Sequence, residues 1–244
     1  MIGCDCPVCT SNDQRNQRLR SSLWLKIHGL SLLVDAGPDL RHQALRENIR
    51  SVDAVLYTHG HLDHVAGFDE LRAFCWRRDR PLPIYANPGC MNTLQSMFAW
   101  AFSPNNTHGG YVKPDPHIVR DTFFIGPLRI TPLPVFHGTV ETNGYLFEAE
   151  SQKKIAYIPD AKVIPNDTIA LLQKCDILII DALREQPHPT HLCVEETLSI
   201  IEQVQPQQAY LTHISHETNH QDLESRLPSN IKIAYDQLTI SLDL

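Results

Sequence analysis

The chain has 244 residues, of which 42% are hydrophobic and 20% are charged, as is ordinary for a globular protein. It has no run of about 18 apolar residues, so no membrane span is expected, and its formal charge of −7 disfavours a nucleic acid partner. The seven cysteines are an odd number, and the N-terminus lacks the features of a secretory signal, so a reducing, cytoplasmic setting is expected.

Short apolar, β-branched runs alternate with helical stretches along the chain. Strands are expected at 22–27, 30–36, 54–58, 83–86, 128–135, 144–150, 154–160, 177–182, 209–213, 232–236 and 239–242. Helices are expected at 38–49, 67–79, 89–101, 164–174 and 192–204, and 103–117 is the longest expected loop. This pattern predicts a single α/β domain over residues 1–244, in which helices cover the outer faces of two sheets.

Metal-competent side chains stand at or just after the ends of four expected strands. They are His59, His137, Asp160 and His213. Because strand ends on a rigid scaffold commonly position chemistry, these side chains from distant parts of the chain could converge on one site.

The run Thr58–His64 reads THGHLDH and holds three imidazoles and one carboxylate. Gly60 allows a tight turn in which His59 and His61 can face one ion, whereas Asp63 and His64 belong to the next turn. The loop therefore offers ligands for two ions, and imidazole with carboxylate suits zinc, iron or manganese. A histidine-rich surface loop is the alternative interpretation.

This motif, placed after a hydrophobic strand, resembles the signature of the metallo-β-lactamase superfamily, and the later single ligands follow the order of that family over nearly the whole chain. The resemblance implies a four-layer αββα sandwich with two mixed sheets and a binuclear Mn²⁺ or Zn²⁺ site along one edge. It assigns His59, His61 and His137 to one ion, Asp63, His64 and His213 to the other, and Asp160 to a bridge between them. Asp181 is a competing strand-end carboxylate, so the preference for Asp160 rests on the Pro-Asp pattern of the family.

Asp35, in LLVDAGPDLRHQ, resembles the aspartate that follows the second strand in this family. The role that this implies is to accept the free N–H of a metal-binding imidazole and so to fix its tautomer. An aspartate that closes a strand into a Gly-Pro turn is equally consistent with the sequence.

The N-terminal GCDCPVC places Cys4, Cys6 and Cys9 on one short loop, where disulfides would have poor geometry. A tetrahedral structural zinc needs a fourth ligand, for which His216 is the candidate and nearby His220 the alternative. Residues 1–9 and 213–216 would then form one zinc loop. The combination resembles the PhnP branch of the superfamily, whose phosphodiesterases act on cyclic phosphoribosyl phosphates in phosphonate breakdown, although a pyrroloquinoline-quinone biosynthesis branch also carries an N-terminal cysteine cluster.

The segment LREQPHPTHLCVEE places His188 and His191 on a Pro-rich loop before an expected helix. In the PhnP-like pattern, the histidine of PTH reaches the active site without binding metal, which makes His191 the candidate general acid. His188 is interpreted as a loop residue. Alternatively, Thr190 is the helix N-cap and His191 merely lies beside it.

The resemblance thus implies a phosphodiesterase in which a metal-bound hydroxide attacks a small, cyclic phosphate diester such as phosphoribosyl 1,2-cyclic phosphate. His191 would protonate the leaving oxygen. The resemblance implies that Asp63 is a second catalytic residue. The alternatives are a tRNA 3′-processing nuclease, a thiolester or lactone hydrolase, and a cofactor-handling protein of the quinone pathway. The resemblance also suggests a homodimer.

Overall fold

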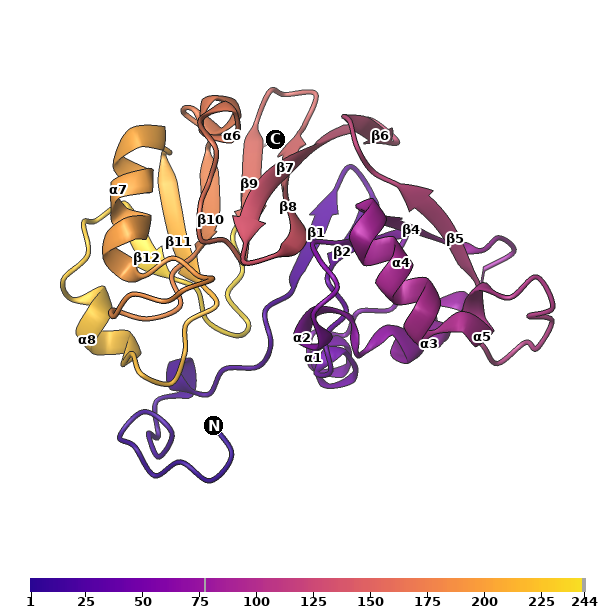
Figure 1. Cartoon of the computed structure of the whole chain (residues 1–244), viewed down its shortest axis with the longest axis horizontal. Helices are drawn as coiled ribbons and strands as arrows, with labels where there is room; N and C mark the ends of the chain where they lie inside the picture. Colours follow the sequence, from indigo (N-terminus) through magenta and orange to yellow (C-terminus); the bar gives the residue numbers. More distant parts are fainter. Residues whose placement is uncertain (77, 243–244) are drawn as a thin grey trace. The chain divides into compact units, whose positions relative to one another are not determined.

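The computed structural model describes residues 1–76 and 78–242 and divides the chain into two compact units. Unit 1 comprises residues 1–19, 128–139 and 144–244, and unit 2 comprises residues 20–127 and 140–143 (Figure 1). Each unit holds a β-sheet with both parallel and antiparallel pairs, together with helices. The predicted α/β class with two mixed sheets is therefore confirmed, whereas the single domain over 1–244 stays a prediction.

The sheet of unit 2 has the strand order β1-β2-β3-β4-β5. The bounds are β1 Leu23–Ile27, β2 Leu30–Val34, β3 Ala54–Tyr57, β4 Leu82–Ala86 and β5 Pro114–Ile118, and the short β6 Phe123–Ile125 follows in the chain. Only β1 and β2 pair antiparallel among these five. All four residues of β3 are buried, as expected of a central parallel strand, so the residues that follow it start from a rigid base.

The helices of unit 2 are short. They are α1 Leu40–Arg46, α2 Leu62–Val65, the 3₁₀ helix η2 Phe68–Leu71, α3 Arg72–Cys75, α4 Pro88–Met97 and α5 Ala99–Phe102. The helix expected at 89–101 is interrupted at Phe98, which has non-helical backbone angles. Asn87 caps α4 by accepting the backbone N–H of Cys90 at 2.7 Å. Phe68, Leu71 and Leu94 pack with β3 and β4 in the core of this unit.

In unit 1 the strands follow the order β12-β11-β10-β9-β8-β7. The bounds are β7 Leu128–His137, β8 Val140–Glu148, β9 Lys154–Ile158, β10 Ile177–Asp181, β11 Gln208–Thr212 and β12 Ile231–Ile233. Strands β9 to β12 run parallel, so their carboxyl ends lie at the same edge of the sheet. Asp160, Asp181 and His213 stand at or near that edge.

The helices of unit 1 are η1 Gln14–Asn16, α6 Asn166–Leu172, α7 Val194–Val204 and α8 His220–Glu224. The apolar side of α7 packs on β10 and β11 in the core of this unit, as Figure 1 shows for the ribbons. Its N-cap is Cys193, whose N–H is accepted by Glu196 at 2.9 Å, so Thr190 is not the cap of this helix.

Several sequence-based expectations were wrong. Residues 239–242 form no strand, and the expected loop 103–117 contains the start of β5. Pro114 and Pro116 argued against a strand, but β5 lies at the end of its sheet, where prolines are tolerated because no partner needs their missing N–H. The short helices α2 and α8 were not predicted, because four or five residues show no helical periodicity.

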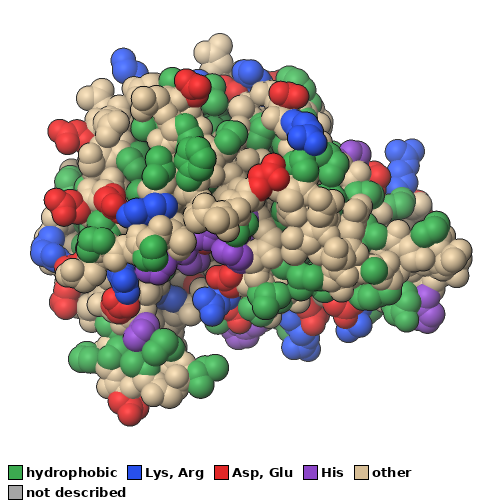
Figure 2. All heavy atoms as spheres, in the orientation of Figure 1, with side chains coloured by type: hydrophobic (Ala, Val, Ile, Leu, Met, Phe, Trp, Pro, Cys, Tyr) green, Lys and Arg blue, Asp and Glu red, His purple; other side chains and the backbone are tan. Residues whose placement is uncertain are grey.

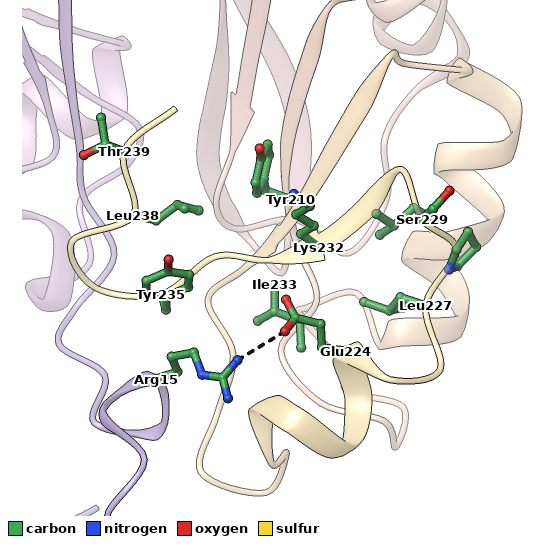
Figure 3. A pocket seen from close by; sticks show the side chains of 12 residues that line it. Arg15, Tyr210, Glu224, Leu227, Ser229, Lys232, Ile233, Tyr235, Leu238 and Thr239 are labelled. Carbon is green, nitrogen blue, oxygen red and sulfur yellow. Dashed lines mark hydrogen bonds and ion pairs between the residues drawn. The ribbon is translucent and has the colours of Figure 1, made fainter. Parts of the chain in front are cut away.

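The N-terminal segment Met1–Leu19 is docked on α8. Arg15 forms ion pairs with Asp13 at 2.8 Å and with Glu224 of α8 at 3.3 Å (Figure 3). A cleft of about 540 Å³ opens beside this pair and is lined in part by Tyr210 and Tyr235.

Among the described residues, none of the helices combines the length and the apolar character that crossing a membrane requires. On the face drawn in Figure 2, Lys and Arg side chains are interspersed with Asp and Glu side chains. This face therefore has no broad basic area of the kind that binds a polynucleotide backbone.

The core of unit 1 gives a direct test of its contribution to stability. Leu178 of β10 is fully buried, whereas Leu171 of α6 is 44% exposed. We expect Leu178→Ala to lower the free energy of unfolding by about 2–5 kcal/mol, because it leaves a cavity. The same truncation in Leu171→Ala should change it by about 0.5 kcal/mol or less. Urea unfolding of both variants measures the difference, and equal effects would contradict this description of the core.

Candidate functional site

In unit 2, the loop that follows β3 brings two imidazoles together. Nε2 of His59 lies 3.0 Å from Nδ1 of His61. Two nitrogen ligands, each about 2.1 Å from one ion, lie roughly 3.0–3.4 Å apart for angles between a right angle and the tetrahedral angle. The separation therefore fits two ligands of one ion. Gly60 contributes in a way that the sequence did not indicate, because a Cβ at this position would lie 2.8 Å from Oγ1 of Thr93 in α4.

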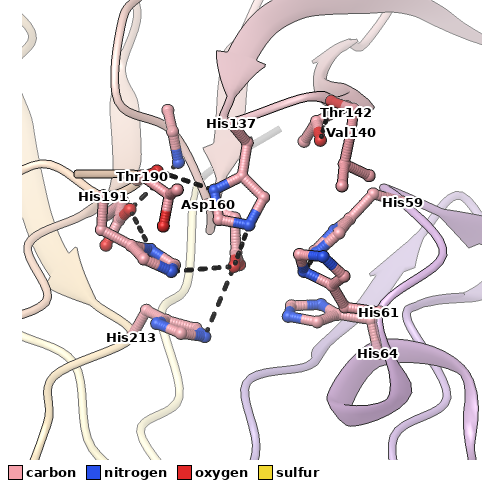
Figure 4. Close-up of polar contacts among 12 residues, drawn as sticks. His59, His61, His64, His137, Val140, Thr142, Asp160, Thr190, His191 and His213 are labelled. Atoms are coloured by element: carbon pink, nitrogen blue, oxygen red, sulfur yellow. Dashed lines mark hydrogen bonds and ion pairs between the residues drawn. The ribbon is translucent and has the colours of Figure 1, made fainter.

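A fully buried carboxylate, that of Asp35, organises this loop. Its Oδ1 accepts the backbone N–H of Thr58 at 2.8 Å, and its Oδ2 accepts the hydroxyl of Thr58 at 2.9 Å. Nδ1 of His64 also lies 2.8 Å from Oδ2 (Figure 4 shows the ring of His64 beside those of His59 and His61). Because the proton of the Thr58 hydroxyl is directed to Asp35, its oxygen is left to accept from Nδ1 of His59, 3.0 Å away. His59 and His64 are then both protonated at Nδ1, so each ring carries its lone pair, the group that binds metal, at Nε2.

Asp35 occupies this position at an energetic cost. Its backbone has a φ of +63°, in the left-handed region that non-glycine residues rarely adopt. Burial raises the pKa of its carboxyl, and the neighbouring His64 opposes that rise. Strain and a buried carboxylate together are typical of functional sites, where the surrounding structure holds them in place.

The second turn of the motif is held against the end of β2. The N–H of Ala36 donates to the carbonyl of His64 at 2.9 Å, and the N–H of Gly67 donates back to Ala36 at 2.9 Å. A Cβ on Gly37 would collide with the carbonyl oxygen of Asp63, so this approach requires glycine. The carboxylate of Asp63 lies 3.8 Å from Nε2 of His64.

In unit 1, one carboxylate gathers three histidines. Oδ2 of Asp160 lies 3.7 Å from Nε2 of His137, 3.9 Å from Nε2 of His191 and 3.6 Å from Nε2 of His213 (Figure 4). Asp160 and His137 are buried, although each belongs to a residue type that is costly to bury without a partner. Donor atoms of His137, Asp160 and His191 lie within 4.8 Å of one another, close enough to hold one ion.

The far nitrogens of two of these rings are hydrogen-bonded, which determines their tautomers. Nδ1 of His137 donates to the backbone carbonyl of Thr190 at 2.7 Å, and Nδ1 of His191 donates to Oδ2 of Asp181 at 2.8 Å. Each ring therefore presents Nε2 toward Asp160.

The carboxylate of Asp181 lies on the Nδ1 side of the His191 ring and not beside the Nε2 atoms that surround Asp160. Its Oδ2 also accepts the N–H of Ala161 at 3.0 Å, so it braces the residue that follows Asp160 as well. Burial raises the pKa of Asp181 to about 6, and the hydrogen bond from His191 opposes that rise. Of the two carboxylates that the sequence left in competition, Asp160 is thus the one surrounded by imidazoles, whereas Asp181 supports them.

His213 stands just past the end of β11 with a φ of +58°. A non-glycine residue in this region costs about 1–3 kcal/mol, which the surrounding contacts must offset. Its ring stacks on that of His191, with centroids 4.9 Å apart and an angle of 13° between the planes.

The three N-terminal cysteines lie together with His216. Cys4, Cys6, Cys9 and His216 have donor atoms within 4.8 Å of one another, and Nδ1 of His216 is 3.5 Å from Sγ of Cys4. A hydrogen bond with His216 is the largest cause that lowers the pKa of the Cys6 thiol, to about 6. His220, the alternative fourth ligand, is instead fully buried, with its ring against Tyr235 and its Nε2 3.5 Å from Glu224.

The donor atoms of the cysteine cluster and those of the histidine and aspartate residues each fit a metal ion. Three sulfurs and one imidazole nitrogen match a tetrahedral structural zinc. Buried imidazoles that present Nε2 beside a carboxylate match a catalytic transition metal. The sequence did not single out Thr58 or the carbonyl of Thr190, since threonines and backbone carbonyls carry no metal-binding pattern.

Comparison with known proteins agrees with this chemistry. A family model described as a beta-lactamase superfamily domain matches residues 31–214. The crystal structure of a diphosphatase from the PhnP family has a TM-score of 0.89 and 37% identity, over 98% of this chain and 89% of that one.

Two curated relatives are longer than this chain. An octanoyltransferase of Porphyromonas gingivalis is 35% identical over 99% of this chain, which spans 49% of that protein. A coenzyme PQQ synthesis protein B of a Methylobacterium species is 30% identical over 73% of this chain and 66% of that protein. The chain therefore spans about half of the first relative and about two thirds of the second. From the matched residues 31–214 and the likeness to the diphosphatase, the chain belongs to the metallo-β-lactamase superfamily and, within it, to the PhnP family.

Proposed function

We propose that this chain is a binuclear metal-dependent phosphodiesterase that hydrolyses a small, cyclic phosphate diester such as phosphoribosyl 1,2-cyclic phosphate. The observation that carries the proposal is the carboxylate of Asp160, which lies 3.6–3.9 Å from the Nε2 atoms of His137, His191 and His213. Such a set has little use as a structural element, because each buried polar group costs free energy unless it is paired or bound to metal. Likeness to a PhnP-family diphosphatase supports phosphate chemistry.

The proposed ligands are those of the family pattern. His59, His61 and His137 would hold one ion, Asp63, His64 and His213 the other, and Asp160 would bridge them. In each unit taken by itself, the supporting hydrogen bonds leave Nε2 lone pairs for this purpose. Two divalent ions, Mn²⁺ or Zn²⁺, would supply Lewis acidity and make water acidic enough to react near neutral pH.

His191 is proposed to handle the proton of the leaving oxygen. Its Nδ1 is committed to Asp181, so a proton exchanged with substrate must pass through Nε2. The paired carboxylate orients the ring and stabilises its cationic form as the proton arrives. The same Nε2 could instead bind metal with His137 and Asp160, and these two roles predict different metal contents when His191 is replaced.

Four further expectations from the sequence stay proposals. Cys4, Cys6, Cys9 and His216 would hold one structural zinc, supported by the proximity of their donor atoms. The substrate would be a small molecule and not a polynucleotide, supported by the net charge of −7. Residence in the cytoplasm is supported by the odd number of cysteines, and a homodimeric state is supported by the family resemblance alone.

A second candidate substrate class is a diphosphate, in which a phosphoric anhydride is cleaved. The observation that favours it is the diphosphatase activity named for the 37% identical structure. Because an octanoyltransferase is among the relatives, an acyl thiolester is a third substrate class to test, although this chain spans only about half of that protein.

A panel of substrates tests the proposal. The manganese-loaded chain should hydrolyse ribose 1,2-cyclic phosphate and bis(p-nitrophenyl) phosphate in preference to adenosine diphosphate, precursor tRNA and octanoyl-coenzyme A. Asp160→Asn should lower kcat/KM by about a thousandfold and reduce the bound manganese, because the carboxylate neutralises the ions.

The control for this variant is Asp176→Asn, which alters a buried carboxylate at the start of β10 that pairs with Lys153. It should leave kcat/KM within about twofold, as expected for a residue remote from reacting groups. Preference for adenosine diphosphate would show that the substrate is a diphosphate and not a cyclic phosphate diester. Full activity of Asp160→Asn would refute the assignment of Asp160 as a metal ligand.

Replacement of His191 separates a proton donor from a metal ligand. If His191 acts as general acid, His191→Gln should lower kcat by about 10²–10⁴-fold while the bound manganese per chain is unchanged. His188→Gln is the matched control, since the His188 ring lies 5.1 Å from that of His191 on the same loop. It should stay within about twofold of the parent. Loss of manganese in His191→Gln, measured by elemental analysis, would identify His191 as a ligand.

Asp181 should give stability a distinctive pH dependence. Burial raises its pKa from 3.8 to about 6, so between these values the folded chain binds a proton that the unfolded chain has lost. Its contribution to stability is therefore full below pH 3.8 and is lost as the pH rises through 6, by about 2–3 kcal/mol in all. In metal-free protein, Asp181→Asn should gain stability relative to the parent over this interval and then level off.

The matched comparison is again Asp176→Asn. For Asp176, burial acts to raise the pKa, but the hydrogen bonds from the side chain of Lys153 and the backbone N–H of Lys154, together with the charge of Lys153, outweigh it, so the net pKa is lowered. That variant should therefore lose stability relative to the parent as the pH rises, the opposite sign. Urea unfolding between pH 3 and 7.5 measures both trends, since that of Asp176→Asn lies at and below pH 3.8 and that of Asp181→Asn lies between pH 3.8 and 6. Parallel curves for the parent and Asp181→Asn would contradict the raised pKa of Asp181.

A further inference from the structure

The loop of residues 213–219 carries two proposed ligands of different ions but has no regular secondary structure. His213 at its start belongs to the proposed catalytic set, and His216, three residues later, lies with the cysteines. Because His213 has a left-handed backbone, contacts outside the loop must hold it there. One such contact is the N–H of Ser215, which donates to the carbonyl of Leu183 at 2.7 Å.

On the other side of the loop, the side chain of Arg18 from the N-terminal segment holds two backbone carbonyls. Nη1 of Arg18 donates to the carbonyls of Ser215 at 2.8 Å and Thr218 at 3.0 Å, and its Nη2 donates to Thr218 at 3.0 Å. Nη2 also donates to Oδ1 of Asn16, which in turn accepts the N–H of His220 at 2.9 Å. A guanidinium can make this set of bonds because its donors are fixed in one plane.

Arg18 and the cysteines belong to the same short segment, Met1–Leu19, so the loop is attached to this segment at two points. One is the contact of His216 with Cys4 and Cys6, at 3.5 and 3.6 Å, and the other is Arg18. A change in the order of the cysteine loop therefore reaches the loop of His213 through both points. Coupling of this kind is reciprocal, since each site alters the other by the same factor.

We propose that Arg18 is a positioning residue that ties the N-terminal segment to loop 213–219, so that zinc binding by the cysteines and metal binding through His213 strengthen one another. This inference rests on the proposed function for the identity of His213 as a ligand. It assigns a regulatory consequence to the N-terminal zinc loop: a chain that loses zinc or has oxidised cysteines would bind its catalytic metal more weakly.

The test is amide hydrogen exchange of the full chain, loaded with zinc and manganese, in Arg18→Met and in Arg15→Met. Arg15 is the matched control, because it lies three residues away and its guanidinium pairs with Asp13 and with Glu224 of α8 instead of the loop. Arg18→Met should raise exchange in peptides covering 213–219 by about tenfold and weaken binding of Mn²⁺ by a similar factor, as expected for the loss of charge-assisted hydrogen bonds. Arg15→Met should change either quantity by less than about twofold.

Coupling is measured by adding Cys9→Ser to the parent and to Arg18→Met. In the parent, Cys9→Ser should raise exchange in 213–219 about tenfold, whereas in Arg18→Met it should add about threefold or less, because only the connection through His216 remains. Arg18→Lys, which keeps a cation able to reach one carbonyl, should fall between parent and Arg18→Met and serves if the methionine variant fails to fold.

Three outcomes would overturn the inference: unchanged exchange in 213–219, equal and additive effects of the two substitutions, or a rise spread evenly over β9 to β11. None of these readouts uses a substrate. A chain that hydrolyses no phosphate ester can therefore still confirm the coupling, and an active phosphodiesterase can still refute it.

Discussion

Two fully buried aspartates, one in each unit, are the constraint on which the rest of this structure depends. Asp35 and Asp181 each lie 2.8 Å from Nδ1 of a histidine, and burial raises the pKa of both carboxyls. A carboxylate in such surroundings is costly unless it is paired, so each aspartate requires its histidine as much as it orients it. The hydrogen bond in turn fixes the histidine ring, because an imidazole that donates through Nδ1 can bind metal or exchange a proton only through Nε2.

Two residues at the proposed sites also have a strained backbone. Asp35 and His213 both adopt left-handed backbone conformations that their residue types disfavour. The regular parts of each unit hold them there: the end of β2 holds Asp35, and the end of β11, with the hydrogen bonds of Ser215, holds His213. Rigid strands thus carry irregular, strained positions at their carboxyl ends, which is where metal ligands and proton donors need exact placement.

Membership of the metallo-β-lactamase superfamily places the chain in a hydrolase family. The residues of this chain support a more specific proposal. The hydrogen-bonded pair of Asp181 and His191, proposed to handle a proton, suits a reaction with a poor leaving oxygen, for which an acid is needed. Loop 213–219 connects two of these regions, because the ring of His213 stacks on that of His191 whereas His216 lies with the N-terminal cysteines. The proposed catalytic and structural metal ligands of this loop are therefore only three residues apart.

The sequence by itself determined the α/β class, most strands to within two residues, and the family, because apolar periodicity and the spacing of THGHLDH are local properties of the chain. It also singled out Asp35 beside the histidines. Only the tertiary structure shows that imidazoles surround Asp160 while Asp181 lies behind one of them, and that His216 and not His220 lies with the cysteines. It also shows that Arg18 holds loop 213–219. Those choices depend on which side chains meet across long sequence separations, and no pattern of neighbouring residues encodes that.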